Sequence, residues 1–510
     1  MQPGRHRRLA CQQGQALIYG LFLLIASLAG MFFLFNTGQL ASEKTRLVNA
    51  ADAVAYSAAV LHARALNFDA YNNRALIANE VLVAQLVSAS SWAQYAKTHV
   101  ENVPVIFPEC MVPNGTGAAV GALNNYGPEY ALMCYAIAQP ELPVRQAIEL
   151  LAEAVPPTAV TAITAIEASK RAIQAAQQFL HTDVVFMQTR RALLQDVADR
   201  NYAGSGNVTV VPGGIGSGAA GAMLPDGWKT FTKRYSDDER GRMAESAAKA
   251  TEKIKFVNER KWESKALLPL GNGFCFFHKN EVIRRGGTNL IGLDEWKAED
   301  TESFWSWHPR GFIFVRCRKD ETPIAWGEQR AFPPDGEQDA SGARLGGSPG
   351  DNPRAHSFAS STEWTNYTGM PAFYDLSQAQ LDSTDPRLMF AVKLVRDASQ
   401  TPTSSGTSGI RPSARLNHFP SALAGGVMSA ISTGEVYFER PWFNSGNHSY
   451  TTGDMAYIVT KNQSIPNGPL DPKMRELGSL FNPYWQVHLT NNDADSVKQQ
   501  QQAQSGARLP

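Results

Sequence analysis

The sequence lacks an excess of either charge, because lysine plus arginine and aspartate plus glutamate each number 47 among the 510 residues. No stretch rich in lysine and arginine stands out, which argues against nucleic acid as a partner. The chain also lacks an H-E-x-x-H pattern and a Walker loop, the local signatures of one class of zinc peptidase and of P-loop nucleotidases. These absences favour a non-enzymatic protein without a cofactor or a metal.

Charged residues are missing altogether between Arg8 and Glu43. The core of this stretch, Ala16 to Phe35, is almost wholly apolar and has the length of about 20 residues that spans a bilayer as one helix. A basic cluster precedes it at residues 5–8 and none follows, which predicts a cytoplasmic N-terminus and an exported body. The alternative is a signal peptide cleaved near Ser27-Leu28-Ala29, but the apolar run continues past that point. The pattern favours a retained, single-pass anchor.

Cysteine is scarce, with five residues in the chain. Cys11 falls on the predicted cytoplasmic side, whereas Cys110, Cys134, Cys275 and Cys317 fall in the exported part. An even number of cysteines in an oxidising compartment predicts two disulfides. The local pairing Cys110–Cys134 and Cys275–Cys317 is our hypothesis, although four cysteines allow three connectivities.

Proline is absent from Gly38 until Pro104, so the anchor is expected to continue as a long helix, with a break near Asn72-Asn73 left open. Large apolar residues recur every seven positions along this helix, at Leu40, Leu47, Val54, Leu61 and Phe68, with Ala51, Ala58 and Ala65 between them, which predicts a seam for close helix packing. The seam either packs on the chain's own domain or contacts a partner chain. Asp52, beside the seam, either pairs with Arg46 or a neighbour's Lys44, or is solvated. The candidate interface residues are Leu40, Leu47, Ala51, Asp52, Val54, Ala58 and Leu61.

The remaining chain divides into a helical part and a part rich in short aromatic and β-branched runs. We expect a second helical region from Val144 to Asn201, interrupted at Pro156-Pro157, to form a hairpin on the first helix. The predicted fold class is α+β: a transmembrane helix continuing into a long helix and a helical hairpin, then a β-rich C-terminal domain. The predicted boundaries are a cytoplasmic tail at 1–14, an anchor at 15–36, a periplasmic helical region at 37–202 with a disulfide loop at 103–140, a glycine-rich linker at 203–235, a helix plus β-rich domain at 236–490 and a disordered tail at 491–510.

Two patterns that resemble sites of known chemistry lack the context that the chemistry needs. Cys275-x-x-His278 with His308 and Cys317 supplies four zinc-type ligands, but the last two are not spaced as usual ligands and the cysteines are expected to pair. The run Gly216 to Gly221 matches G-x-G-x-x-G, but Pro225 follows at once and leaves no room for the helix that binds a pyrophosphate. Both patterns therefore favour structural roles.

The N-terminal segment carries a family resemblance. Gly14-Gln15-Ala16-Leu17 opens the apolar run, Asn36-Thr37-Gly38-Gln39-Leu40 follows it, and Lys44 to Ala53 reads K-T-R-L-V-N-A-A-D-A. This segment resembles the N-terminal domain of the TadG-like and TadE-like proteins of bacterial Flp (tight-adherence) pilus machinery. The resemblance implies an inner-membrane anchor, a periplasmic body and a pseudopilin-like or scaffold role in pilus assembly.

Two departures from the family pattern limit what the resemblance carries. The fifth residue after Gly14 is Tyr19 rather than the glutamate of processed pilins, which puts prepilin-type cleavage in doubt. Asp375-Leu376-Ser377 begins a D-x-S-x-S pattern but lacks its last serine, so a von Willebrand type A metal site is not carried over. The expected partners are the inner membrane, other pilus-assembly components and further copies of the chain. The alternatives are a tethered binding or adhesive protein and a tethered hydrolase.

Overall fold

The computed structural model describes most of the chain. The described residues are 13–107, 124–138, 143–212, 226–269, 275, 277–311, 316–334, 351–383, 385–404, 426–439, 478–492 and 494. The predicted cytoplasmic tail and the predicted disordered tail fall almost wholly outside these residues, as do Cys11, Cys110, the middle of the predicted disulfide loop (108–123) and the middle of the predicted glycine-rich linker (213–225).

One helix, α1 (Gln13–Ile106), runs through 94 residues without interruption. At 1.5 Å per residue this corresponds to about 140 Å. The break considered at Asn72-Asn73 does not occur. The Asn73 side chain instead donates hydrogen bonds to the carbonyls of Tyr374 and Leu480, each at 2.7 Å, so its amide stabilises a tertiary contact rather than competing with the helix.

Two further helices lie along α1, as predicted for the hairpin region. α4 (Val144–Leu180) continues through Pro156-Pro157, so the predicted interruption there is wrong. Those prolines occupy half-buried and exposed positions, where water can donate to the carbonyls that lose their helical partners. The chain breaks later, at His181-Thr182, before α5 (Asp183–Asn201) begins.

The strands form two larger sheets and one small one. The five-stranded sheet has the order β3-β4-β5-β6-β7, antiparallel except for the parallel pair β6–β7, and the four-stranded sheet has the order β1-β9-β10-β11. The predicted linker 203–235 is partly structured, because it contributes β1 and β2. The strands are β1 Thr209–Pro212, β2 Thr232–Tyr235, β3 Trp262–Lys265, β4 Glu281–Ile291, β5 Glu295–Arg310, β6 Arg316–Ala331, β7 Ser361–Trp364, β8 Phe373–Leu376, β9 Arg387–Asp397, β10 Val427–Phe438 and β11 Trp485–Thr490. The remaining helices are α3 Pro128–Ala138, α6 Trp228–Phe231, η2 Asp237–Arg240, α7 Gly241–Glu252, α8 Lys255–Asn258, α9 Pro353–Phe358, α10 Gln378–Leu381 and η5 Ala398–Gln400.

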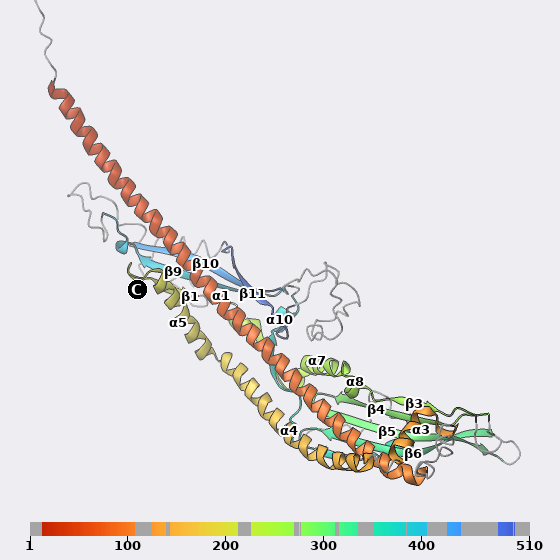
Figure 1. Ribbon diagram of the computed structural model, residues 1–510. Helices are drawn as coiled ribbons and strands as arrows, with labels where there is room; N and C mark the ends of the chain where they lie inside the picture. The colour runs from red at the N-terminus through yellow and green to blue at the C-terminus, as the bar shows by residue number, and fades with distance from the viewer. Residues whose placement is uncertain are drawn as a thin grey trace, which may run out of the picture.

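Both larger sheets dock directly on α1, at points where a glycine removes the side chain between strand and helix. A Cβ on Gly327 of β6 would lie 2.2 Å from the Ser91 carbonyl oxygen, and one on Gly434 of β10 would lie 2.6 Å from that of Ala55. Figure 1 shows α1 running the length of the molecule, with α4 and α5 along one side and the sheets along the other. The predicted α+β fold, with a long N-terminal helix followed by a β-rich region, is confirmed.

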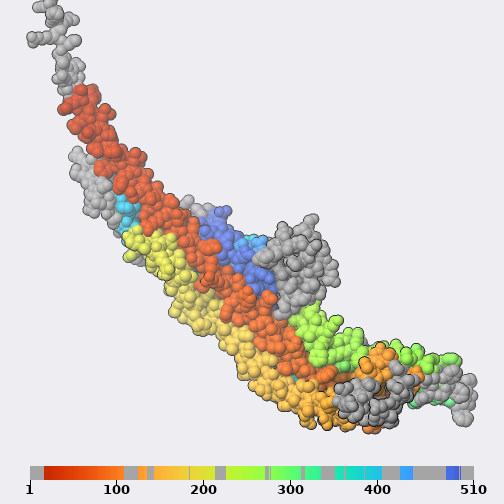
Figure 2. Space-filling view, viewed as in Figure 1, coloured from red at the N-terminus to blue at the C-terminus, as the bar shows by residue number. Residues whose placement is uncertain are grey.

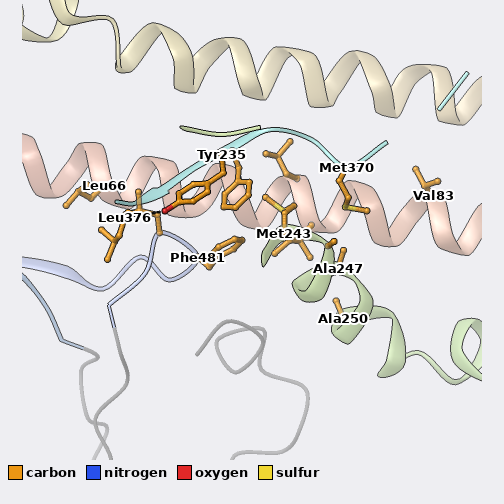
Figure 3. Packing of buried hydrophobic residues seen from close by; sticks show 14 of the residues in the cluster. Leu66, Val83, Tyr235, Met243, Ala247, Ala250, Met370, Leu376 and Phe481 are labelled. Carbon is orange, nitrogen blue, oxygen red and sulfur yellow. Dashed lines mark hydrogen bonds between the residues drawn. The ribbon is translucent and has the colours of Figure 1, made fainter. Parts of the chain in front are cut away.

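The hydrophobic core follows α1 rather than forming one central nucleus. Three buried clusters each include residues of this helix. In Figure 3, Met243 and Ala247 of α7 point toward the part of α1 that contains Leu66 and Val83. Because helices and sheets from the whole chain bury their apolar faces on α1, this helix acts as the spine of the body.

Candidate functional site

The N-terminal part of α1 projects beyond the rest of the molecule (Figures 1 and 2). Two helices of the described residues are long and apolar enough to cross a membrane, Ala16–Ile106 and Val144–Leu180. The most apolar window of the first is entirely exposed, whereas the second helix packs along α1. A fully exposed, uncharged apolar helix is suited to a lipid environment, because every backbone polar group is satisfied within the helix. The exposed large side chains of this segment are Leu17, Ile18, Tyr19, Leu21, Phe22, Leu23, Leu24, Ile25, Leu28, Met31, Phe33 and Leu34.

Among the described residues, the body makes a hydrogen-bonded contact with α1 at Asn36, directly after this apolar run. The Asn36 side chain is buried, donates to Ser404 Oγ at 2.8 Å and accepts from the Ser404 amide at 2.7 Å. Two turns further, Glu43 pairs with the buried Arg396 at 3.1 Å. These two contacts join the body to α1 at the point where the chain would leave a bilayer.

Tyr202, at the end of α5, completes this junction. The guanidinium carbons of Arg46 and Arg396 each lie 4.6 Å from the centre of its ring. Burial, together with the neighbouring Glu43 carboxylate, raises the pKa of the Tyr202 hydroxyl to about 12. Arg46 also donates to the Asn201 carbonyl and to Ser205, so it does not form the ion pair considered with Asp52.

The predicted seam of α1 is covered by the chain's own body. Leu47, Ala51, Val54 and Ala58 are fully buried in a cluster with residues of α5, β9 and β10. Leu40 packs half-buried against this cluster, and Leu61 against the neighbouring one. The structure thus shows the alternative in which the seam packs on its own domain. Contacts of these residues with another chain stay a prediction, and Asp52 remains half-exposed beside them.

A different set of side chains on α1 faces solvent. The heptad positions from Leu47 to Leu61 lie on the covered side of the helix, but the last one, Phe68, is 41% exposed, so the predicted seam is wrong at that residue. The other exposed apolar side chains do not share a single repeat and were not identified from the sequence. The helix remains visible along much of its length in Figure 2. The exposed large apolar residues of this part of α1 are Val48, Tyr56, Phe68, Tyr71 and Leu82. Exposed large apolar side chains on this helix are candidates for contact with another protein.

Buried polar clusters hold α1 in register with its neighbours. Glu80 of α1 accepts from Lys170 of α4 at 2.6 Å, from Trp296 Nε1 at 3.0 Å and from the Tyr367 hydroxyl at 2.7 Å. Lys170 also binds Glu167 at 2.7 Å. The side chains in this cluster are enclosed by protein, and each makes a structural contact. The cluster therefore orients α1 against α4 and the five-stranded sheet.

Histidines form part of similar clusters further along α1. His99 contacts Glu302 at 2.8 Å, and although burial alone would raise the pKa of Glu302, this contact helps to hold it below its usual value. His181 contacts Asp69 at 2.7 Å, and burial raises the pKa of that carboxyl. Burial, with the adjacent Arg190 guanidinium, lowers the pKa of His62 to about 3. His62 is therefore neutral at physiological pH.

The residues considered for metal binding have structural partners instead. Cys275 and Cys317 form a disulfide, so the predicted pairing of these two is confirmed and the alternative of zinc ligands is excluded for them. Asp375 is buried and accepts hydrogen bonds from the amides of Leu376 and Leu480 at 2.8 and 2.9 Å. No group of three potential ligands for a metal is found in the described part of the chain. Cys134 is also disulfide-bonded, and its predicted partner Cys110 lies outside the described residues.

Comparison with known proteins places the N-terminal region in a family context. Residues 14–61 match the family model Tad, described as Flp pilus-assembly TadE/G-like. This confirms the resemblance noted for the N-terminal segment. No curated protein and no solved structure matches the chain.

Proposed function

We propose that this protein is a non-enzymatic, membrane-anchored periplasmic component of a Tad/Flp-type pilus-assembly or secretion apparatus, acting as a pseudopilin-like subunit or a scaffold. The observation that carries the proposal is the extent of the family match. Residues 14–61 comprise both the bare apolar segment of α1 and the turns on which the body first docks. The matched region is therefore the junction between the anchor and the body.

The arrangement of α1 supports this role. Its uncharged first part can be held in the inner membrane, and the basic cluster at residues 5–8 favours a cytoplasmic N-terminus. The rest of the helix carries α4 and α5 along one side and the sheets along another (Figure 1), and the positions between them leave Tyr56, Phe68 and Tyr71 exposed to partners. The proposed partners are other pilus-assembly components and further copies of the chain.

The predicted interface residues pack inside the body, so the proposed contacts with partners lie at other positions of α1. Ala51 and Ala58 let the four-stranded sheet approach α1 closely, which leaves Tyr56 and Phe68 directed away from the body. The exposed fractions of Tyr56, Phe68 and Tyr71 are 46%, 41% and 63%. These aromatic side chains are the proposed contacts with partners, because rigid aromatic groups stabilise interfaces at low entropic cost.

Site-specific photocrosslinking tests the proposal. A photoreactive phenylalanine analogue replaces Tyr56 or Phe68 in the full-length, C-terminally tagged chain, and native membranes are irradiated before purification. The matched control carries the analogue at Phe256 of α8, an aromatic residue that is similarly exposed, at 43%. We expect adducts with pilus-assembly proteins or with a second copy of the chain from the α1 positions and none from Phe256.

Mass spectrometry of the purified material identifies the crosslinked and co-purifying proteins, and so shows when the result contradicts the proposal. Recovery of the chain alone, with no adduct from either α1 position and no co-purifying assembly protein, would contradict an assembly role. A C-terminal tag accessible from outside the inner membrane would in that case favour a free-standing tethered binding protein. Protection of the tag in the cytoplasm would contradict the proposed orientation.

A further inference from the structure

The end of the five-stranded sheet lies far from the bare apolar segment. β6 runs antiparallel to α1, since Thr98 binds the backbone of Trp326 at 2.8 and 2.9 Å and Asn102 binds the Ile324 carbonyl at 2.8 Å. The helix from Asn36 to Asn102 spans about 99 Å. Continuing β6 from Ile324 to Arg316 adds about 26 Å in the same direction. Figure 1 shows this end of the sheet beyond the C-terminal end of α1.

Cations gather on one face of the β5–β6 ribbon at this end. Arg310 lies directly opposite Arg316, and His308 opposite Arg318, so alternate residues of both strands place the three arginines and the His308 ring on the same face. Like charges directly opposite each other destabilise a strand pair. The nearby counter-charge is Asp320, which lies 3.6 Å from Arg310 and 3.8 Å from Arg318.

The local charge differs sharply from that of the whole chain. The described residues 277–279, 307–311 and 316–318 include the four cations Lys279, Arg310, Arg316 and Arg318, and Asp320, two positions after Arg318, is the carboxylate that pairs with two of them. Over all 510 residues the two charges balance. Arg310 and Arg318 are 60% and 66% exposed, and the Cys275–Cys317 disulfide links this end of β6 to the β3–β4 connection. The structure therefore holds a cationic surface in place at its far end.

Large apolar side chains are also exposed at this end of the sheet. Leu267, Leu268 and Phe277, all in the β3–β4 connection, are 51%, 48% and 77% exposed. The connection lies at the same end as the cations, because the Trp307 indole donates to the Lys279 carbonyl at 3.1 Å and its ring stacks on His278. We define these three apolar residues and the four cations as the distal surface.

We propose that the distal surface binds an anionic lipid membrane, so that the chain bridges two membranes. Cations attract anionic headgroups, while exposed leucine and phenylalanine side chains insert among the acyl chains. A soluble acidic polymer would satisfy the cations but leave the apolar side chains in water. The distal surface lies about 125 Å from the end of the bare segment, and a 40° tilt of the anchor still leaves about 95 Å. The membrane bound there is therefore a second one.

Co-flotation tests the bridging of two membranes by the whole protein. The full-length chain is inserted through its anchor into nanodiscs of neutral phosphatidylcholine and mixed with separate vesicles. We expect the nanodiscs to float with vesicles that contain 30% phosphatidylglycerol, to remain behind with pure phosphatidylcholine vesicles, and to dissociate as salt is added. Failure to float with the anionic vesicles at low salt would overturn the proposal.

Charge-reversed variants locate the binding surface. Each cation near an anionic membrane strengthens binding by about fivefold, so the triple variant Arg310→Glu, Arg316→Glu, Arg318→Glu should bind at least about 100-fold more weakly. The matched control, Lys249→Glu, Lys253→Glu, Lys255→Glu, changes the net charge equally on α7, α8 and the turn between them, where all three lysines are exposed. Equal loss of binding by the two triple variants would refute a localised surface.

A third variant distinguishes a membrane from an acidic polymer. Phe277→Ser retains every charge and should still weaken vesicle binding severalfold, because it removes an inserting side chain. Unchanged vesicle binding by Phe277→Ser, together with full displacement of the vesicles by soluble polyglutamate at equal charge, would identify an acidic polymer as the ligand and overturn the lipid proposal. The inference depends on the anchor but not on a pilus role, so a negative photocrosslinking result at Tyr56 and Phe68 leaves it standing.

Discussion

Replacing Gly327 by alanine should separate the five-stranded sheet from α1. The new Cβ would lie 2.2 Å from the Ser91 carbonyl oxygen and 2.6 Å from the Tyr95 amide nitrogen. Ordinary contacts between such atoms are about 3.5 Å or more, so helix and strand must move apart by about 1 Å. Both obstructing atoms belong to the backbone of a helix, which cannot yield as a flexible side chain can.

The expected cost follows from the contacts at this point. Overpacking alone costs about 1–3 kcal/mol. The displacement also stretches the hydrogen bonds from Ser91 to Asp300 at 2.8 Å and to the Gly327 carbonyl at 3.2 Å, and those between Thr98 and the Trp326 backbone. At about 1 kcal/mol for each bond, loss of half of them adds about 2 kcal/mol. We expect the free energy of unfolding to fall by about 4 kcal/mol.

Guanidinium unfolding of the detergent-solubilised chain, followed by tryptophan fluorescence, measures this change. Gly241→Ala is the matched control, because nothing lies within 4 Å of a Cβ built there and Gly241 begins α7 with helical dihedral angles. That variant should be neutral, or more stable by up to about 1 kcal/mol. If Gly327→Ala unfolds at the same denaturant concentration as the unmodified protein, direct docking of β6 on α1 is refuted.

Two further predictions concern buried charge. Lys170→Met leaves the carboxylates of Glu80 and Glu167 buried without their cation. Chemical denaturation should therefore show a loss of about 3–5 kcal/mol in the free energy of unfolding. An unchanged denaturant concentration at the unfolding midpoint would contradict the ion-pair cluster. His62 has a pKa of about 3 in the folded protein and an ordinary value of 6.5 in the unfolded chain. Between these values the unfolded state binds protons more readily, so the free energy of unfolding decreases as the pH is lowered. Between pH 7 and pH 5 His62 should account for a loss of about 2 kcal/mol in the free energy of unfolding. His62→Gln should remove that part of the pH dependence in urea titrations. An identical pH dependence in the variant would show that His62 is accessible to protons in the folded protein.

Features that depend on neighbouring residues were predictable from the sequence. The uncharged run after Arg8 predicted the exposed apolar helix, and the absence of proline before Pro104 predicted its continuation to Ile106. The seam containing Leu47 and Ala58 identified part of the packed side of α1, but its last position, Phe68, is exposed. The interruption expected at Pro156-Pro157 was wrong, because a helix tolerates prolines where the freed carbonyls are not sealed from water.

The candidate surfaces were harder to predict from the sequence, because they depend on which parts of α1 and of the sheets the rest of the chain covers. The same periodic pattern around Leu47 fits an intermolecular seam and an intramolecular one, and only the positions of β9, β10 and α5 distinguish them. The cationic face at Arg310 and Arg316 arises from strand register, which pairs residues across a hairpin. Asp375 began a metal-binding pattern, yet its environment turns it into a backbone acceptor.

The sequence by itself determined the local features of this protein: the apolar segment, the long helix and the family match of residues 14–61, because each depends on residues that are close in the chain. The tertiary structure decided which side of α1 is buried and where the cations gather. The buried side of α1 rests on contacts such as Asn36 with Ser404 and Gly434 with Ala55, between residues that are hundreds of positions apart, whereas the cations gather through the register of β5 and β6. A pattern of apolar residues shows that a surface will be covered, but the covering partner is chosen by the packing of the whole chain.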